Sequence, residues 1–161
     1  MDHAKLAQLL FPQVTETPQQ LLEQRYPRRT LKEGAQITRF APSPTGFLHI
    51  GGVFSAMVSE RVAHTTGGKV ILRIEDTDKK REVQGGVDLI VQGLRDFGIE
   101  FDEGALGDGK ESGDYGPYTQ SQRGPLYHVF ARDLVEKGLA YPCFCTGGEI
   151  EEIRRGQEAQ G

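Results

Sequence analysis

The residues best suited to chemistry lie together in residues 38–52, which read Thr-Arg-Phe-Ala-Pro-Ser-Pro-Thr-Gly-Phe-Leu-His-Ile-Gly-Gly. The prolines at 42 and 44 cannot continue a strand ladder, and from residue 53 the pattern becomes helical. Gly51 and Gly52 therefore stand at a helix start, where unpaired N–H groups and the helix dipole favour an anion. His49 can donate from its imidazole to a phosphate oxygen. The stretch predicts a nucleotide phosphate site, although His-x-Gly-Gly alone would also suit an ordinary surface turn.

Two opposite charges in neighbouring predicted strands add a second kind of chemistry. Arg39 interrupts an apolar strand, and Glu75 ends the next strand, directly before Asp76. A buried guanidinium requires an anionic partner, because uncompensated desolvation is costly. Arg39 could pair internally with Glu75 or Asp76. Alternatively, its fork could hold a substrate carboxylate while Glu75 holds an ammonium group, which would make an amino-acid site.

A close pair of thiols lies near the carboxyl end of the chain, at Cys143 and Cys145. Two thiolates can begin a zinc site, but a closed site needs four ligands, and the sequence has no third cysteine. None of the histidines stands at ligand spacing from the pair; they are His3, His49, His64 and His128. The pair is therefore either half of a zinc site or two free thiols.

Basic residues cluster shortly before the first predicted strand. The cluster comprises Arg25, Arg28, Arg29 and Lys32. A solvated linker is the simpler interpretation of such a run, and a contact with an RNA backbone is the alternative.

The elements that must position these residues follow from hydrophobic periodicity. Residues 36–41 and 69–75 read as strands, and residues 53–66 read as a helix that ends at Gly67 and Gly68. A strand, a helix and a strand at this spacing form a βαβ unit with parallel strands. The second strand is nearly continuous in apolar residues, which is typical of a strand buried on both faces. The helix stripe expected to face the core comprises Phe54, Met57, Val58 and Val62.

The remaining elements are expected to be mostly helices. Helices are predicted at residues 83–97, 122–137 and 149–155, with extended chain at residues 139–146. The expected inward residues are Val87, Ile90, Val91, Leu94 and Phe97 in the first helix, and Leu126, Val129, Phe130 and Leu134 in the second. The glycine-rich residues 104–117 read as a long loop. Residues 1–33 look like an appended helical arm, with a helix at residues 3–11 and another that begins at Thr17 and Pro18.

Composition excludes several classes of protein. With a formal net charge of −4, the chain of 161 residues is no general nucleic-acid coat. It has no apolar run that could span a bilayer, and its polar first residues do not resemble a signal peptide. Two cysteines do not make a disulfide framework. We therefore expect a cytoplasmic protein with no membrane partner.

Three ordered blocks resemble the signatures of class I glutamyl-tRNA synthetases. Residues 39–46 read Arg-Phe-Ala-Pro-Ser-Pro-Thr-Gly and residues 48–51 read Leu-His-Ile-Gly; residues 73–78 read Arg-Ile-Glu-Asp-Thr-Asp; residues 116–121 read Gly-Pro-Tyr-Thr-Gln-Ser. The resemblance spans about residues 38–145. The related glutaminyl enzymes usually have Pro-Glu-Pro-Asn-Gly and Asp-Asp-Thr in these blocks. This chain therefore resembles the glutamyl branch, although Gly52 stands where the full signature ends in histidine.

The resemblance implies an α/β fold, namely the N-terminal half of a Rossmann-like, HIGH-type nucleotidylyl transferase sheet. It implies a catalytic part at residues 34–138, after the arm at residues 1–33, and the start of a tRNA acceptor-binding insertion at residues 139–161. The implied activity is that of a glutamate–tRNA ligase, which joins L-glutamate to tRNA(Glu) with ATP and Mg²⁺. In some relatives a Cys-x-Cys pair also begins a Zn²⁺ site in that insertion.

The resemblance also assigns roles to individual residues. His49 and Gly51 would stabilise charge on the reacting phosphate, and ATP would contact Thr45, His49, Gly51 and Gly52. Glutamate would lie among Arg39, Ala41, Ser43 and Glu75, with Arg39 on its side-chain carboxylate.

The sequence is also compatible with other functions. A shorter paralogue that glutamylates a tRNA base, a non-catalytic ATP- or RNA-binding module and another nucleotidylyltransferase are the alternatives, of which the pair Arg39 and Glu75 disfavours the last. We find only the first half of a doubly wound fold and no Lys-Met-Ser-Lys-Ser-like loop. We therefore expect an inactive fragment with an uncovered sheet edge or apolar face, from an enzyme that works as a monomer.

Overall fold

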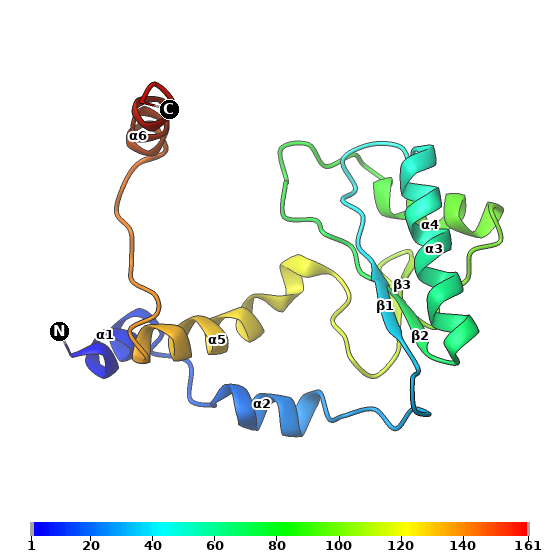
Figure 1. Ribbon diagram of the computed structural model, residues 1–161, viewed down its shortest axis with the longest axis horizontal. Helices are drawn as coiled ribbons and strands as arrows, with labels where there is room; N and C mark the ends of the chain where they lie inside the picture. Colours follow the sequence, from blue (N-terminus) through cyan, green and yellow to red (C-terminus); the bar gives the residue numbers. More distant parts are fainter. Residues whose placement is uncertain (1, 161) are drawn as a thin grey trace. The chain divides into compact units, whose positions relative to one another are not determined.

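The computed structural model describes residues 2–160 and contains a four-stranded sheet. Residues 38–52 and residues 73–78 both leave this sheet at the ends of its strands. Its strands lie in the order β1 (Ile37–Phe40), β2 (Lys69–Leu72), β3 (Glu103–Gly107) and β4 (Lys110–Ser112). The first three strands are parallel, with Arg39 opposite Ile71 and Ile71 opposite Glu103, and β4 runs antiparallel to β3. The expected parallel pairing is thus confirmed, and Figure 1 shows β1 and β2 side by side.

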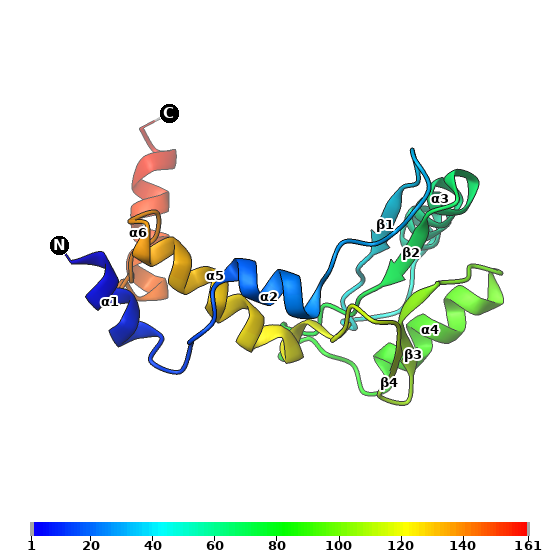
Figure 2. The same ribbon diagram turned by 90° about the horizontal axis from the view of Figure 1, so that it is seen from below.

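The parallel strands are joined by two helices that cover one face of the sheet (Figures 1 and 2). These helices are α3 (Ile50–Thr66) and α4 (Gly86–Asp96). Both contribute to a single core with the sheet, which comprises Val53, Ala56, Leu72, Ile74, Ile90, Val91, Leu94, Ile99 and Ala105. Successive right-handed crossovers in one direction place both helices on the same side, as a Rossmann-like half requires.

The face of α3 that packs on the sheet differs from the one expected. Val53, Ala56, Glu60 and Ala63 are buried. The predicted stripe is exposed instead, from 60% at Phe54 to 40% at Met57. Small side chains let a helix approach a sheet closely, so the alanine face is the one that packs. The large apolar residues consequently form an outward surface, and β1 pairs with no second strand among the described residues.

Strand β2 is also less enclosed than its composition suggested. Burial alternates along it, with Val70, Leu72 and Ile74 buried, while Lys69, Ile71 and Arg73 are only partly buried. One face of the strand therefore meets the helices, and the other carries polar groups.

The region predicted as a loop at residues 104–117 instead contains β4 and most of β3. Gly104 has φ +131°, and a Cβ there would lie 2.2 Å from the Leu72 carbonyl oxygen. Glycine therefore permits the close approach of β3 to β2, and its presence hid the strand from a search for apolar alternation. The hairpin turn uses Gly107, Asp108 and Gly109, all with positive φ.

The outer helices agree with expectation in existence but not in every inward residue. They are α1 (His3–Leu10), α2 (Pro18–Arg25), α5 (Gly124–Glu136) and α6 (Gly147–Glu158), with a short 3₁₀ turn at Gln120–Arg123 before α5. Thr17 forms a reciprocal capping box with Gln20 at the start of α2. Phe97, which was expected to face inward at the end of α4, is 63% exposed. Phe130 and Leu134 of α5 are also exposed, and the buried residues of that helix are Leu126, Val129 and Val135 instead.

The described chain divides into two compact units. One unit is residues 16–129, which contain the sheet, and the other combines residues 2–15 with residues 130–160. Within residues 2–160, no helix is both long enough and apolar enough to cross a membrane.

A histidine links the carboxyl end of α3 to the start of β3. The His64 ring nitrogens lie 2.8 Å from Glu60 Oε1 and 3.1 Å from Asp102 Oδ2. Asp102 Oδ2 also accepts from the Val70 backbone N–H at 2.7 Å. The hydrogen bond to Asp102 and then that to Glu60 raise the pKa of His64, since only the protonated ring donates from both nitrogens.

Gly104→Ala should destabilise the sheet, because the new methyl group meets β2 backbone that cannot move aside. We expect a loss of at least about 2 kcal/mol in the free energy of unfolding, measured by urea denaturation. Gly98→Ala is the matched control, since Gly98 also has a positive φ, +67°, but faces open space. There only the backbone strain of about 1–2 kcal/mol remains. Equal losses in both variants would contradict the close-approach argument.

The His64 contacts should make stability depend on pH. A histidine whose pKa is raised by folding stabilises fully below its unfolded pKa of about 6.5, and this contribution disappears as pH rises through the higher folded pKa. The difference in unfolding free energy between the wild type and His64→Gln should therefore be largest below pH 6.5 and shrink as the pH rises above it. A difference that stays constant or grows would refute the assignment.

Candidate functional site

The turn after β1 is anchored to the sheet by backbone hydrogen bonds. Pro42 accepts at its carbonyl from the Glu75 N–H at 2.9 Å, and Pro44 accepts from Val83 N–H at 2.9 Å. Pro44 is fully buried, and the absence of a Cβ at Gly86 lets α4 come close to it. The prolines thus fix a stiff path from the strand to the helix, as the sequence predicted.

The helix after this turn begins at Ile50, earlier than expected, and His49 is its N-cap. His49 Nδ1 accepts from the Gly52 backbone N–H at 3.4 Å. With Nδ1 as acceptor, the neutral ring carries its proton on Nε2, which is then available to donate. A Cβ at Gly51 would lie 3.0 Å from His49 Cε1, so glycine leaves room for this ring position.

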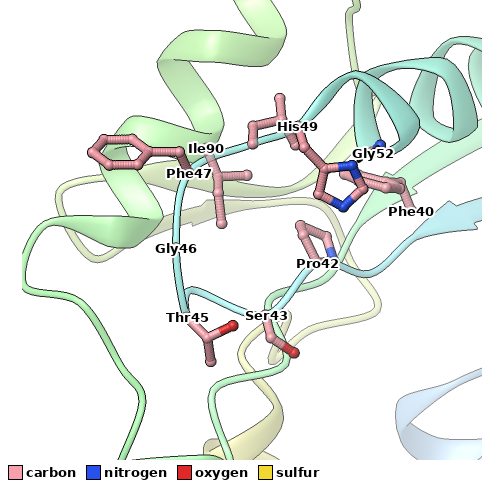
Figure 3. Close-up of a pocket in the computed structure, with 10 residues that line it drawn as sticks. Phe40, Pro42, Ser43, Thr45, Gly46, Phe47, His49, Gly52 and Ile90 are labelled. Atoms are coloured by element: carbon pink, nitrogen blue, oxygen red, sulfur yellow. Dashed lines mark hydrogen bonds between the residues drawn. The ribbon is translucent and has the colours of Figure 1, made fainter.

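A pocket of about 430 Å³ opens at this turn (Figure 3). It is lined by Phe40, Pro42, Ser43, Thr45, Gly46, Phe47, Leu48, His49, Gly52 and Ile90. The pocket brings together Thr45, His49 and Gly52, which the resemblance assigned to ATP, and Ser43, which it assigned to glutamate. Arg39, Ala41, Gly51 and Glu75 do not line it. In Figure 3 the Phe47 ring points away from the His49 imidazole.

The charged residues of the predicted amino-acid site lie on the sheet face opposite α3. Thr38 donates from its hydroxyl to the Ser59 carbonyl on α3, so the alternate residue Arg39 faces the other way. The pairing continues past the strands, because Arg73 N–H donates to the Phe40 carbonyl at 3.0 Å. Arg39, Arg73 and Glu75 consequently project from one face.

The expectation that Arg39 is buried is wrong, and so is the alternative that it pairs internally with Glu75 or Asp76. Arg39 is exposed, and its guanidinium forms no hydrogen bond or ion pair with the described residues 2–160. Because β1 is an edge strand there, the charge stays in solvent and needs no internal anion. The guanidinium is thus available for an external carboxylate.

Sequence reasoning missed the role of Arg73, which had been noted only as part of a motif. Its Nη2 donates to Glu75 Oε1 at 2.5 Å, and the two side chains are 19% and 32% exposed. Within residues 2–160, its buried Nε atom has no hydrogen-bond partner. Strict alternation from Ile71 could have revealed it, because that pattern places residues 71, 73 and 75 on one face.

The next carboxylate along the chain, Asp76, is structural in this arrangement. It accepts from Ser121 N–H at 2.8 Å and Ser121 Oγ at 2.6 Å, and from Lys79 Nζ at 2.8 Å. Burial alone would raise the pKa of Asp76, but the hydrogen bonds from Lys79 and Ser121 outweigh it and hold the pKa below its usual value. Asp76 thereby ties residues 73–78 to residues 116–121.

The thiol pair lies in the other unit, between α5 and α6, and both cysteines are exposed. Hydrogen bonds from the backbone and then the side chain of Cys145 lower the pKa of the Cys143 thiol, while the side-chain hydrogen bond with Cys143 raises the pKa of Cys145. Among the described residues, no group of three or more histidine, cysteine or acidic side chains is placed to hold a metal ion. The two thiols therefore do not fit a zinc centre by themselves.

The fold and this edge of the sheet define a class of protein. The model of the family described as tRNA synthetases class I (E and Q), catalytic domain, matches residues 36–161, so the chain belongs to that family.

Particular relatives within the family are glutamate–tRNA ligases. The ligase of Clostridium perfringens strain 13 is 52% identical over 160 residues, which are 99% of this chain and 29% of that protein. The ligase of Bacillus subtilis strain 168 is 47% identical over 76% of this chain and 25% of its own length. A crystal structure of a glutamate tRNA ligase from Elizabethkingia meningosepticum in complex with its amino acid matches with a TM-score of 0.68 and 41% identity, over 80% of this chain and 25% of that one. The chain thus spans about 29% of the length of the first of these curated relatives.

Proposed function

We propose that this chain supplies the glutamate site and part of the ATP site of a glutamate–tRNA ligase. The observation that carries the proposal is the meeting of two features beyond the carboxyl ends of β1 and β2. One is the α3 helix start with His49, and the other is the sheet face that carries both Glu75 and Arg39, whose guanidinium pairs with no side chain among residues 2–160. The family match and the names of the relatives support the same activity.

The reaction would proceed in two steps. An α-carboxylate oxygen of glutamate attacks the α-phosphorus of ATP, a new O–P bond forms, and the bond to the departing pyrophosphate breaks. A hydroxyl of the terminal ribose of tRNA(Glu) then attacks the acyl carbon, and AMP leaves. Such transfers depend on positioned donors rather than on covalent help from the protein. Magnesium would enter on the ATP phosphates.

Each side of the turn would serve one reactant. His49 would donate from Nε2 to the reacting phosphate, while Gly51 and Gly52 let the phosphate approach the first N–H groups of α3, and Thr45 lies in the same pocket. In this arrangement the cap contact at Nδ1 selects the tautomer that can donate.

The amino acid would be held from the opposite face. Arg39 would bind the side-chain carboxylate with its free guanidinium, and Glu75 would bind the ammonium group. Ala41 and Ser43 would lie along the same substrate. Arg73 keeps the Glu75 carboxylate directed along this face and balances part of its charge. We further propose that residues 34–138 are the catalytic part and that residues 139–161 begin a tRNA acceptor-binding insertion.

His49→Ala should lower adenylate formation by about 10²–10³-fold, as the loss of one preorganised donor typically does. The assay is glutamate-dependent ATP–pyrophosphate exchange. It uses a chimaera in which these 161 residues replace the matching stretch of the Clostridium perfringens relative. An unaltered exchange rate would remove His49 from the mechanism. A wild-type chimaera without any exchange would count against the proposed function itself.

Arg39→Ala should weaken glutamate far more than ATP. The loss of a hydrogen bond between charged groups corresponds to roughly 1.5–3 kcal/mol in glutamate affinity. The same exchange assay gives both KM values, and Arg81→Ala is the control, because Arg81 pairs on the surface with Asp78. If both substrates weaken equally, Arg39 does not select the amino acid.

A further inference from the structure

A short segment after α2 packs against the loop that leads to Ser121. Tyr26 donates from its hydroxyl to the Gly116 carbonyl at 2.7 Å, and Tyr115 donates from its hydroxyl to the Pro27 carbonyl at 2.6 Å. The Arg29 guanidinium lies 3.6 Å from the centre of the Tyr115 ring, which is within the range of a cation–π contact. We call residues 26–29 the brace. The segment lies before residue 36, where the family match begins.

The centre of the brace is a buried ion pair with β3. Arg29 and Glu103 form a two-pronged pair, one prong of which measures 2.6 Å, and their side chains are only 12% and 7% exposed. Tyr118 donates to Glu103 Oε2 at 2.8 Å and is itself 2% exposed. Burial and then the bond to Glu103 raise the pKa of Tyr118 to about 12, so this hydroxyl remains a donor.

The energetics of such a pair point to positioning. Removal of two charges from water offsets most of their attraction, so a buried pair adds little net stability. The pair does fix geometry, because the planar guanidinium donates two parallel hydrogen bonds that hold the carboxylate in one orientation. Arg29 therefore determines where Glu103 lies, and Glu103 determines where Tyr118 lies.

The backbone of Tyr118 is hydrogen-bonded to the strand end that leads to Glu75, in the predicted amino-acid site. Ile74 N–H donates to the Tyr118 carbonyl at 2.9 Å, and Gln120 N–H donates to the Ile74 carbonyl at 2.8 Å. Ser121 then holds Asp76. Ile74 directly precedes Glu75, so both neighbours of Glu75 are fixed by the loop that the brace holds.

We propose that Arg29 is a positioning residue for the strand end that carries Glu75, acting through Glu103 and Tyr118. Its effect on glutamate binding rests on the function proposed above, whereas its effect on the strand end does not. Arg29 is then neither part of a solvated linker nor a contact for an RNA backbone, because its guanidinium is already occupied inside the protein.

Hydrogen exchange of backbone amides in the 161-residue chain tests the positioning directly. In Arg29→Met, the amides of Ile74, Gln120 and Ser121 should exchange about 10- to 100-fold faster, since their hydrogen bonds open more often. The Val53 amide, which donates to the His49 carbonyl at the start of α3, should keep its rate. Arg25→Met is the matched control, because Arg25 pairs with Glu16 and its side chain is 52% exposed.

Two outcomes would overturn the proposal. One is unchanged exchange at Ile74, Gln120 and Ser121; the other is an equal acceleration at Val53, which would mean general destabilisation. Tyr118→Phe removes the hydroxyl bond to Glu103 and the one that this hydroxyl accepts from the Tyr115 N–H at 3.0 Å, but it leaves the ion pair in place. It therefore provides a second test if Arg29→Met does not fold. Arg29→Lys should restore part of the protection.

Glutamate titration followed by NMR gives the functional readout. Arg29→Met should weaken glutamate about 10-fold and leave ATP affinity unchanged. Equal affinity for glutamate in the variant and the wild type would show that the brace does not serve the amino-acid site. Absence of glutamate binding by the wild type would overturn the proposed function, while the exchange rates would still decide the role of Arg29 at the strand end.

Discussion

The arrangement of the site depends on the parallel pairing of β1 with β2 and on its continuation beyond both strands. The Arg73 and Glu75 N–H groups donate to the carbonyls of Phe40 and Pro42, so two motifs that lie far apart in sequence are held side by side by main-chain bonds. Pro42 can take part in this pairing because it contributes only its carbonyl oxygen, and the group that a proline lacks is the backbone N–H. The motif with His49 and the motif with Glu75 thus reach their positions through backbone geometry.

The same pairing separates the two predicted reactants. Residues that alternate along β1 point to opposite faces, so Phe40 meets the helices while Arg39 faces away from them. The pocket around His49 lies on the helix side, and the face with Arg39, Arg73 and Glu75 lies on the other side. Two ligands bound as proposed would meet where the strand ends, since only there can ligands from both faces come together. Arg73, and the brace as proposed, position the strand end that carries Glu75, whereas the buried Pro44 packs against Gly86 and anchors the turn.

The sequence was informative where a residue type has few roles. Prolines, paired glycines and a histidine before a helix predicted the turn, and the βαβ spacing predicted the parallel sheet. It was misleading where the outcome depends on tertiary contacts. The buried face of α3 is formed by alanines because they allow close packing, and β3 was hidden because its glycine is needed for closeness to Leu72. Arg39 seemed buried by its neighbours, but an edge strand exposes it. The ion pair of Arg29 with Glu103 joins distant parts of the chain, so no local pattern could predict it.

The cap at the start of α3 has a consequence for how the site is assembled. His49 is both the N-cap of the helix and the group proposed to contact phosphate, so the ring is held with Nε2 as its donor only once the helix start has formed. Many histidines in proteins are oriented by a carboxylate, which would add a negative charge near an incoming polyphosphate. Here a backbone amide performs that orientation without any net charge. A polyanion can therefore approach an imidazole donor that the fold itself has oriented. If the first turn of α3 frays, the imidazole loses this orientation.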